Sequence, residues 1–318
     1  MKKNFFLFNI LFLSIIFSQN MSMPSLAIEQ TQPVQSDKTL TTAQDKPKEE
    51  NTVYTYYVKN DQSEAANELN TFIAKYLIDL NTHDIQKTGD HYASNYISGD
   101  GFNKNQVIDL IKQTWKKYPD LKYSTVIKNL RLDNNRASIE FSENITATTK
   151  DKSEITKDNG NVNGTSHNVL YLEKYGCGWK IITDKMLYEE TDIKYGTAKN
   201  ININFNVPEQ IISGEDYTAS LKINLPENVF ALGSLASVPL VYPVKQPTET
   251  FRQLPPELST LERVIKSNKD CLNEISSASV SFCEAQRTNY TNLDLKVTGI
   301  AVILKRVNVL PGSVKKSN

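Results

Sequence analysis

Glu143 stands where a carboxyl group could do acid–base chemistry. Residues 137 to 147 alternate between apolar and polar side chains, which is typical of a strand with one buried face. Glu143 falls on the apolar face, together with Ile139, Phe141 and Ile145. A carboxylate among apolar neighbours is costly to ionise, so its pKa rises and it can act as an acid or a base. The alternative is a bulge or strand end that turns Glu143 to solvent.

His91 and Asp184 are two further candidates. Histidine titrates near neutral pH, so His91 could serve as a general base. Asp184 shares a predicted strand face with Ile182 and Met186, which places it either in a pocket or on an exposed hairpin. Neither residue belongs to a spacing motif, and helix capping or a place at a pocket rim explains them as well.

Motifs that carry a known mechanism are missing from the sequence. It contains no G-x-S-x-G, no P-loop, no H-E-x-x-H and no dinucleotide-binding glycine pattern. His83, His91 and His167 pair neither with cysteines nor with each other at metal-ligand spacing. We therefore expect no metal and no cofactor, and hydrolase or nucleotide chemistry has no support in the sequence.

The first 27 residues have the order of a secretory signal peptide. Lys2 and Lys3 precede an apolar run over 5–17, and small residues at 25 and 27 stand before a cut at Ile28. The run is shorter than the ~20 residues that a membrane span needs, so cleavage is expected, with an uncleaved anchor as the alternative. We expect a secreted or periplasmic protein with no membrane span after signal removal.

The charge is nearly balanced once this leader is gone. Removing Lys2 and Lys3 leaves 34 basic and 36 acidic residues, with the basic ones scattered. Capture of nucleic acid needs a basic face, so we expect no nucleic-acid partner. Residues 28 to 60 contain few large apolar side chains outside 53–58, which predicts a flexible linker with a candidate edge strand.

Three cysteines would enter an oxidising compartment, where disulfides persist. Cys271 and Cys283 lie close in the sequence and are a candidate disulfide. The odd count leaves Cys177, in a Gly-Cys-Gly turn, free or intermolecular. A solvent-facing turn thiol is the simpler interpretation of Cys177.

A first domain is predicted over residues 61 to 191. Apolar residues at helical spacing follow a capping pattern near Glu64, and Asn103 with Gln106 forms a second capping pattern. Alternation then predicts antiparallel strands. The expected elements are a helix from about 64 to 80, short helix 91–97, helix 103–118, strands 121–132 and 137–147, polar loop 148–165, and a hairpin of 169–175 with 179–187.

A second domain is predicted over residues 200 to 312. Residues 188 to 200 are charged and small, and we place the domain boundary there. Alternation at 201–207 and 217–225 predicts a β-sandwich-like domain. Apolar residues at helical spacing predict one inserted helix over about 258–275, and a last strand or strand pair is bent at Gly299.

The predicted element order and one hairpin resemble a known superfamily. Three helices precede strands that end in Glu173-Lys174-Tyr175-Gly176-Cys177-Gly178-Trp179-Lys180-Ile181-Ile182-Thr183-Asp184. Over residues 62 to 190 this resembles the nuclear transport factor 2-like, or SnoaL-like, superfamily, whose members often close with a Gly turn, Trp, a basic residue and Ile. The resemblance implies an α+β cone, in which a curved sheet wraps the helices around a pocket. It places Asp84 and His91 near the pocket mouth and makes Tyr92, Tyr96, Glu143 and Asp184 candidate ligand-binding residues.

Three functional hypotheses follow, because this superfamily holds enzymes, carriers and interaction modules. The first is a non-catalytic secreted or periplasmic protein that binds a small apolar ligand or an envelope protein. The second is a small isomerase- or dehydratase-type enzyme that uses Glu143, His91 or Asp184. The superfamily's isomerases share a Tyr and an acidic residue inside the cone, and no such pair is placed here residue by residue. The third is a structural envelope module that docks through its second domain.

Overall fold

The computed structural model describes residues 64 to 312 except 177, 244, 255–258 and 288–292. The predictions at 1–60 and at Cys177 lie outside these residues. The elements are α2 (Glu64–Asn81), α3 (Ile85–Asp90), α4 (Lys104–Lys117), β1 (Lys122–Asp133), β2 (Arg136–Lys152), β3 (Asn159–Tyr175), β4 (Gly178–Gly196), η1 (Thr197–Asn200), β5 (Ile203–Asn206), β6 (Gln210–Ile212), β7 (Asp216–Ile223), β8 (Val229–Pro239), β9 (Arg252–Gln253), β10 (Thr260–Lys266), β11 (Glu274–Arg287) and β12 (Leu293–Leu310).

The long helices form where the sequence predicts them. The buried stripe of α2 includes Leu69, Ile73 and Leu77. At the start of α4, the Asn103 side chain accepts from the Gln106 amide, and the Gln106 side chain accepts from the Asn103 amide. This capping box satisfies two main-chain donors and fixes where α4 begins.

The short helix predicted at 91–97 is wrong. The helix in this region is α3, which Asp84 caps and which ends at His91. After α3 the main chain forms hydrogen bonds to the sheet. The Ala93 amide donates to the Ile181 carbonyl, and the Ile181 amide donates to the His91 carbonyl. These long-range bonds take the groups that a helix would have used.

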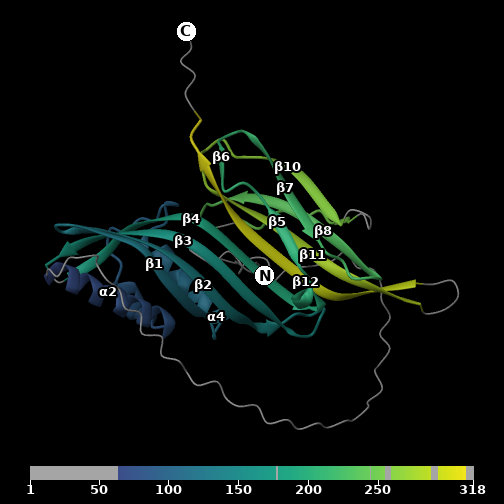
Figure 1. The fold of residues 1–318 in the computed structure, drawn as a ribbon, viewed down its shortest axis with the longest axis horizontal. Helices are drawn as coiled ribbons and strands as arrows, with labels where there is room; N and C mark the ends of the chain where they lie inside the picture. The colour runs from purple at the N-terminus through teal and green to yellow at the C-terminus, as the bar shows by residue number, and fades with distance from the viewer. Residues whose placement is uncertain (1–63, 177, 244, 255–258, 288–292, 313–318) are drawn as a thin grey trace, which may run out of the picture.

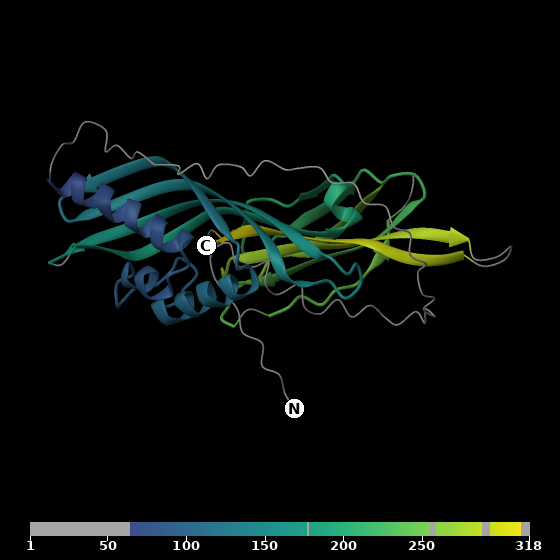
Figure 2. The ribbon, with the colours of Figure 1, turned by 90° about the horizontal axis from the view of Figure 1, so that it is seen from below.

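A nine-stranded sheet runs through the molecule in the order β1-β2-β3-β4-β12-β11-β8-β9, with β6 paired to β12. The predicted pairing of β1 with β2 around the turn at 133–135 is confirmed. The predicted polar loop at 148–165 is wrong, because β2 runs to Lys152 and β3 starts at Asn159. α2 and α4 lie against one face of β1 to β4 (Figures 1 and 2).

The sheet is continuous across the predicted domain boundary. Most of residues 188–200 belong to β4, whose Gly196 pairs with Gly299 of β12. Gly196 has a φ of +56°, and a Cβ there would lie 2.1 Å from the Thr298 carbonyl oxygen. The chain therefore leaves β4 at a position that only glycine fits. The limits of the two domains, 61–191 and 200–312, stay predictions.

β12 serves two cores because its side chains alternate between the faces of the sheet. Ile300, Val302 and Leu304 join the core beneath the helices. Ala301 and Ile303 join a second core, between the sheet and a three-stranded layer of order β10-β7-β5. The chain is thus α+β, with helices over one half of the long sheet and a second strand layer over the other half (Figure 1).

Two further predictions for the second half are wrong. Residues 260–266 form strand β10, not a helix, and this strand pairs with β7 along its whole length. Leu261 and Ile265 pack against the second core, whereas Val264 is 67% exposed. Cys271 and Cys283 are both free thiols, one exposed and one buried. The helical spacing was incidental, since pairing with β7 fixes the strand and leaves Leu261 and Ile265 against the second core.

Candidate functional site

Glu143 faces the interior of the cone, as predicted. Glu143 is 5% exposed, and the Thr125 hydroxyl of the neighbouring strand donates a hydrogen bond to its carboxyl group at 2.9 Å. Burial raises the pKa of this carboxyl to about 7, and the Thr125 bond opposes that rise. At neutral pH the group is therefore divided between its two protonation states.

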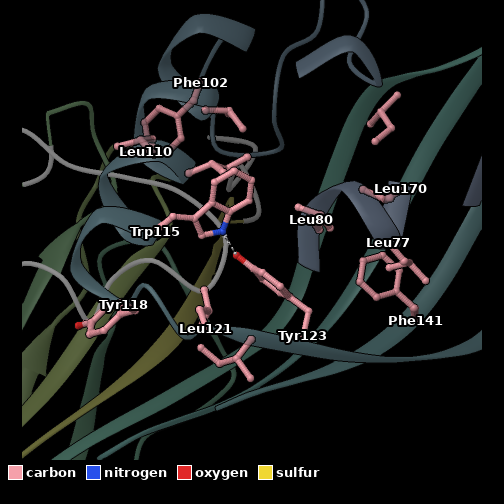
Figure 3. Packing of buried hydrophobic residues seen from close by; sticks show 14 of the residues in the cluster. Leu77, Leu80, Phe102, Leu110, Trp115, Tyr118, Leu121, Tyr123, Phe141 and Leu170 are labelled. Atoms are coloured by element: carbon pink, nitrogen blue, oxygen red, sulfur yellow. Dashed lines mark hydrogen bonds between the residues drawn. The ribbon is translucent and has the colours of Figure 1, made fainter. Parts of the chain in front are cut away.

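Tyrosines surround this carboxyl. The hydroxyl oxygens of Tyr76 and Tyr92 lie 3.2 Å apart, and the Trp115 indole donates to the Tyr123 hydroxyl at 3.1 Å (Figure 3). Burial raises the pKa of each of these tyrosines, and the charge of Glu143 raises it further. They remain neutral phenols, able to donate or accept a hydrogen bond.

Asp184 occupies a second buried position, near the loop that precedes α4. Its carboxylate accepts from the Gly99 amide at 2.9 Å, and burial raises its pKa to about 6. The Tyr96 hydroxyl lies close enough for the charge of Asp184 to raise its pKa, yet it makes no hydrogen bond of ordinary geometry within the described chain. Tyr96 and Asp184 thus lie close together, a pairing that the sequence analysis did not place, with Tyr92 beside Tyr96 at a ring separation of 4.9 Å.

His91 pairs with Asp79, a residue that the sequence analysis missed. The His91 Nε2 lies 2.8 Å from Asp79 Oδ2, and both side chains are buried. Burial lowers the pKa of His91, so the imidazole is neutral near pH 7. The sequence did hold a signal for this pair: Asp79 is a charged residue on the apolar side of α2, between Tyr76 and Leu80. Tyr76 also contacts this pair, because its ring packs edge-on against His91 at 5.4 Å.

A buried ion pair joins the two halves and was also missed. Arg306 of β12 donates through two nitrogens to both carboxylate oxygens of Asp100, and Asn273 donates to the same carboxylate at 2.8 Å. The Asp100 and Arg306 side chains are 6% and 3% exposed. The partners are 206 residues apart, so no local pattern could have found them.

An open groove lies outside the cone, between α2 and the hairpin of β3 and β4. Its volume is about 1010 Å³, against 340 and 430 Å³ for two hollows in the second half. Phe72, His91 and Trp179 form its apolar wall, and its rim carries charges of both signs. We call it the α2–hairpin groove. Glu143, Asp184, Tyr92 and Tyr96 line none of these three hollows.

Other candidates are spread over the molecule. Asp84 caps α3, and His167 bonds Glu140 at 2.9 Å from neighbouring strands. Within the described residues no group of three or more His, Cys, Asp or Glu side chains is arranged to hold a metal. Among the described helices, none combines the length and the apolar character that crossing a bilayer requires.

No family model matches the sequence, and no curated protein matches it either. Part of the chain is similar to solved structures. A nuclear transport factor 2-like superfamily protein from Salmonella enterica serovar Typhimurium is 17% identical, over 38% of this chain and 87% of its own, with a TM-score of 0.31. The hexachlorocyclohexane dehydrochlorinase LinA-type3 from Novosphingobium barchaimii is 13% identical, over 39% of this chain and 86% of its own, with a TM-score of 0.31.

A further similar structure is Bd1075 from Bdellovibrio bacteriovorus, at 16% identity and a TM-score of 0.31. The match covers 38% of this chain and 39% of Bd1075, so it spans well under half of that protein. The similar structures thus include proteins of the superfamily that the hairpin sequence resembles. Likeness at this level assigns no activity to this chain.

Proposed function

We propose that this chain is a non-catalytic binding protein that holds a small ligand in the α2–hairpin groove. This proposal rests on the position of the α2–hairpin groove, which is open to solvent and lies outside the cone. The groove is open, and Phe72 and Trp179 stand there among charged side chains, so a ligand could find both an apolar surface and polar partners. The acids inside the cone, by contrast, are packed among the protein's own side chains.

The packing of the cone interior supports this choice. The core beneath the helices includes Val238, Leu240 and Ile275 from the second half of the chain. The Tyr242 ring packs against Phe102 at 6.1 Å, at the edge of the same core. A ligand that reached Glu143 would have to displace part of this packing, whereas a ligand in the groove displaces only water.

We also propose the setting in which the protein works. After cleavage at residue 28 it would act in the periplasm or outside the cell, with the second half as a β-sandwich-like scaffold and an envelope protein as a further partner. N-terminal sequencing of the protein from its native host should begin at Ile28. Material that begins at Met1 in the cytosol would contradict this setting.

Binding in the groove is tested by native mass spectrometry of protein purified from its host. Thr71 lines the groove on α2, and its hydroxyl bonds the Asn67 carbonyl at 2.9 Å. Thr82 makes the same bond to the Ile78 carbonyl, at 2.9 Å, without lining the groove. We expect a bound small molecule on the wild type and on Thr82→Trp, but not on Thr71→Trp. No bound mass on the wild type, or one that survives in Thr71→Trp, counts against the proposal.

A second candidate, an acid–base enzyme, is favoured by the Asp79–His91 pair. An aspartate that accepts from one imidazole nitrogen orients the ring and leaves the other nitrogen as the base. His91 lies in the groove wall, so this nitrogen could meet a substrate proton there. This arrangement suits proton abstraction of the isomerase or dehydratase type.

The test for this candidate is deuterium incorporation into small molecules of a host extract incubated in D₂O. If the protein is an enzyme of this kind, a substrate should take up deuterium when the wild type or His167→Gln is added. It should take up none when His91→Gln is added. His167 is the matched control because it also bonds a carboxylate, on another part of the sheet. The absence of any label that depends on His91 would remove the candidate.

A further inference from the structure

We propose that residues 97–102, the loop that precedes α4, form a pH-dependent clasp between the cone and the second half of the chain. This clasp loop is tight while Asp184 carries a proton and loosens when Asp184 is ionised. The inference goes beyond ligand binding in the α2–hairpin groove and concerns another part of the molecule. It is drawn from the contacts of the loop, from the apolar residues that it carries, and from the charges that face Asp184.

The clasp loop is fixed to the sheet at two neighbouring residues. The Gly99 amide donates to the Asp184 carboxylate of β4 at 2.9 Å. A Cβ at Gly99 would lie 2.8 Å from the Asp184 carbonyl oxygen, so the loop is packed closely on β4 at this point. The Asp100 carboxylate accepts from Arg306 of β12 and from Asn273, which precedes β11. One short loop therefore joins the cone to strands of the second half.

The clasp loop also carries an apolar contact between the two halves. Phe102 is 2% exposed, and its ring meets the Tyr242 ring at a centroid separation of 6.1 Å. Leu240, two residues before Tyr242, belongs to the core beneath the helices. If the loop moves away from the sheet, Phe102 leaves Tyr242, and this edge of the cone core becomes open to solvent.

Three carboxyl groups face one arginine where the clasp loop meets the sheet. Asp100, Glu189 and Asp184 all act on Arg306 through their negative charges. Burial favours the neutral form of Asp100, yet the charge and the two hydrogen bonds of Arg306 outweigh it and keep the pKa of Asp100 below its ordinary value. Asp184 therefore lies near a carboxylate that stays ionised, and two like charges in a poorly hydrated place repel each other.

A proton on Asp184 removes this repulsion. Burial is the largest cause that raises the pKa of Asp184, and the charge of Asp100 raises it further, whereas the Gly99 amide and the Tyr96 hydroxyl lower it. The balance is a pKa of about 6, against 3.8 for an aspartate in water. Tyr92 and Tyr96 add no charge, since burial raises the pKa of both phenols.

The sign of the pH dependence follows from this difference. A closed loop binds the proton of Asp184 more tightly than an open loop, in which Asp184 meets water. The advantage of the closed loop is therefore complete below pH 3.8 and is lost as the pH rises through about 6. Asp100 remains bonded to Arg306 throughout, so the loop loosens at Gly99 first.

The experiment is hydrogen exchange of the Gly99 amide in the purified protein, followed by NMR at pH 5 to 8 and corrected for the intrinsic exchange rate. With a pKa of about 6 in the closed loop and 3.8 in the open loop, the ratio of closed to open loop should fall about tenfold between pH 5 and pH 8. Asp184→Asn cannot ionise and should change less than twofold. Asp109→Asn, an exposed change on α4, should keep the tenfold decrease.

A reference amide separates the clasp from unfolding of the whole chain. The Ile223 amide donates to the Ser259 carbonyl at 2.9 Å in the second strand layer. Opening of a small loop exposes little surface, so low concentrations of urea should speed the exchange of Ile223 and leave that of Gly99 unchanged.

Three results would overturn the clasp. The first is equal protection of Gly99 at pH 5 and pH 8 in the wild type. The second is a tenfold decrease that persists in Asp184→Asn. The third is exchange of Gly99 that depends on urea as steeply as that of Ile223, because Gly99 would then report only global unfolding. None of these results bears on binding in the α2–hairpin groove, so the two proposals stand or fail separately.

Discussion

Buried carboxylates behave differently in the two regions of this molecule. In the cone interior Glu143 has one hydroxyl donor, and burial raises its pKa to about 7. At the junction of the halves Asp100 is as deeply buried, yet its pKa lies below the usual value. The difference is Arg306, which supplies an opposite charge and two hydrogen bonds to Asp100.

Partners therefore decide ionisation where burial is equal. Desolvation is the largest influence on both Glu143 and Asp100, and it raises both pKa values. Only Asp100 has a cation and an amide that together exceed it. Asp184 shows the intermediate case, because one main-chain amide and a distant Arg306 leave its pKa at about 6. Glu143 and Asp184, in the cone interior, therefore gain a proton more readily than ordinary carboxyl groups, whereas Asp100 at the junction stays ionised.

The largest effect is expected from Arg306→Met, which turns Asp100 into a carboxylate without a cation. Removing one partner of a buried ion pair costs about 3–5 kcal/mol, because the other charge stays buried alone. We expect the free energy of unfolding from urea titration at pH 7 to fall by that amount, and the pKa of Asp100 to lie above the ordinary aspartate value in carboxyl NMR titration.

The control is the double variant Arg306→Met with Asp100→Asn, which removes the stranded charge. It should recover a large part of the lost free energy of unfolding, since an amide can still accept from Asn273. If the single variant is as stable as the wild type, the junction pair does not differ from the cone acids in the way argued above.

Glu143→Gln gives the next effect, and it appears in the pH dependence of stability. The folded-state pKa of Glu143 is about 7 against 4.5 in the unfolded chain, so the folded protein binds this proton more tightly. Its contribution to stability is complete below pH 4.5 and is lost as the pH rises to about 7, a change of roughly 3 kcal/mol.

The glutamine variant should lack this decline. The measurement is the free energy of unfolding at intervals between pH 4.5 and 8, compared with Glu154→Gln, an exposed control in the turn between β2 and β3. A wild-type curve that matches the Glu143→Gln curve would show that Glu143 ionises normally. His91 acts in the opposite sense in both variants, because its lowered pKa removes stability as the pH falls below about 6.5.

Local rules were sufficient for the parts of the fold that neighbouring residues control. The capping box at Asn103 and the β1–β2 hairpin at 133–135 depend on side chains within a few positions, and both are confirmed. The inward direction of Glu143 followed from strict alternation. The helix predicted at 258–275 failed because its apolar spacing was ambiguous, and β7, about 40 residues earlier in the chain, decided the outcome through pairing.

The candidate site was predictable to a smaller degree. The cone residues were named from strand alternation and from the superfamily resemblance, whereas Asp79 was overlooked although it interrupts an apolar helix face. The groove depends on how α2 packs beside the hairpin that contains Trp179, and its lysines come from both. Surface lysines carry no local signal of this kind, and neither did the Asp100–Arg306 pair, since only the tertiary structure brings its partners together.

Asn273→Ala sharpens the comparison at the junction. The Asn273 amide donates to Asp100 at 2.8 Å, and a hydrogen bond to a charged group contributes about 1.5–3 kcal/mol. We expect a loss within this range, because Arg306 still holds the carboxylate while the Val309 amide also loses its bond to the Asn273 side-chain carbonyl oxygen, at 3.0 Å. The pKa of Asp100 should rise yet remain below that in Arg306→Met, and NMR titration of the two variants gives the order. A rise as large as that in Arg306→Met would mean that the amide, and not the cation, fixes this charge.

Thr125→Val makes the smallest expected change and tests the cone side. It removes the hydroxyl that donates to Glu143 at 2.9 Å while keeping the shape of the side chain. That bond opposes the effect of burial, so the pKa of Glu143 should rise above about 7 when it is lost. The cost in stability should be about 1 kcal/mol at pH 8 and smaller at pH 5, where the carboxyl is already protonated and needs the donor less. An equal loss at both pH values would indicate that Thr125 stabilises the strand pair itself and has no part in setting the charge of Glu143.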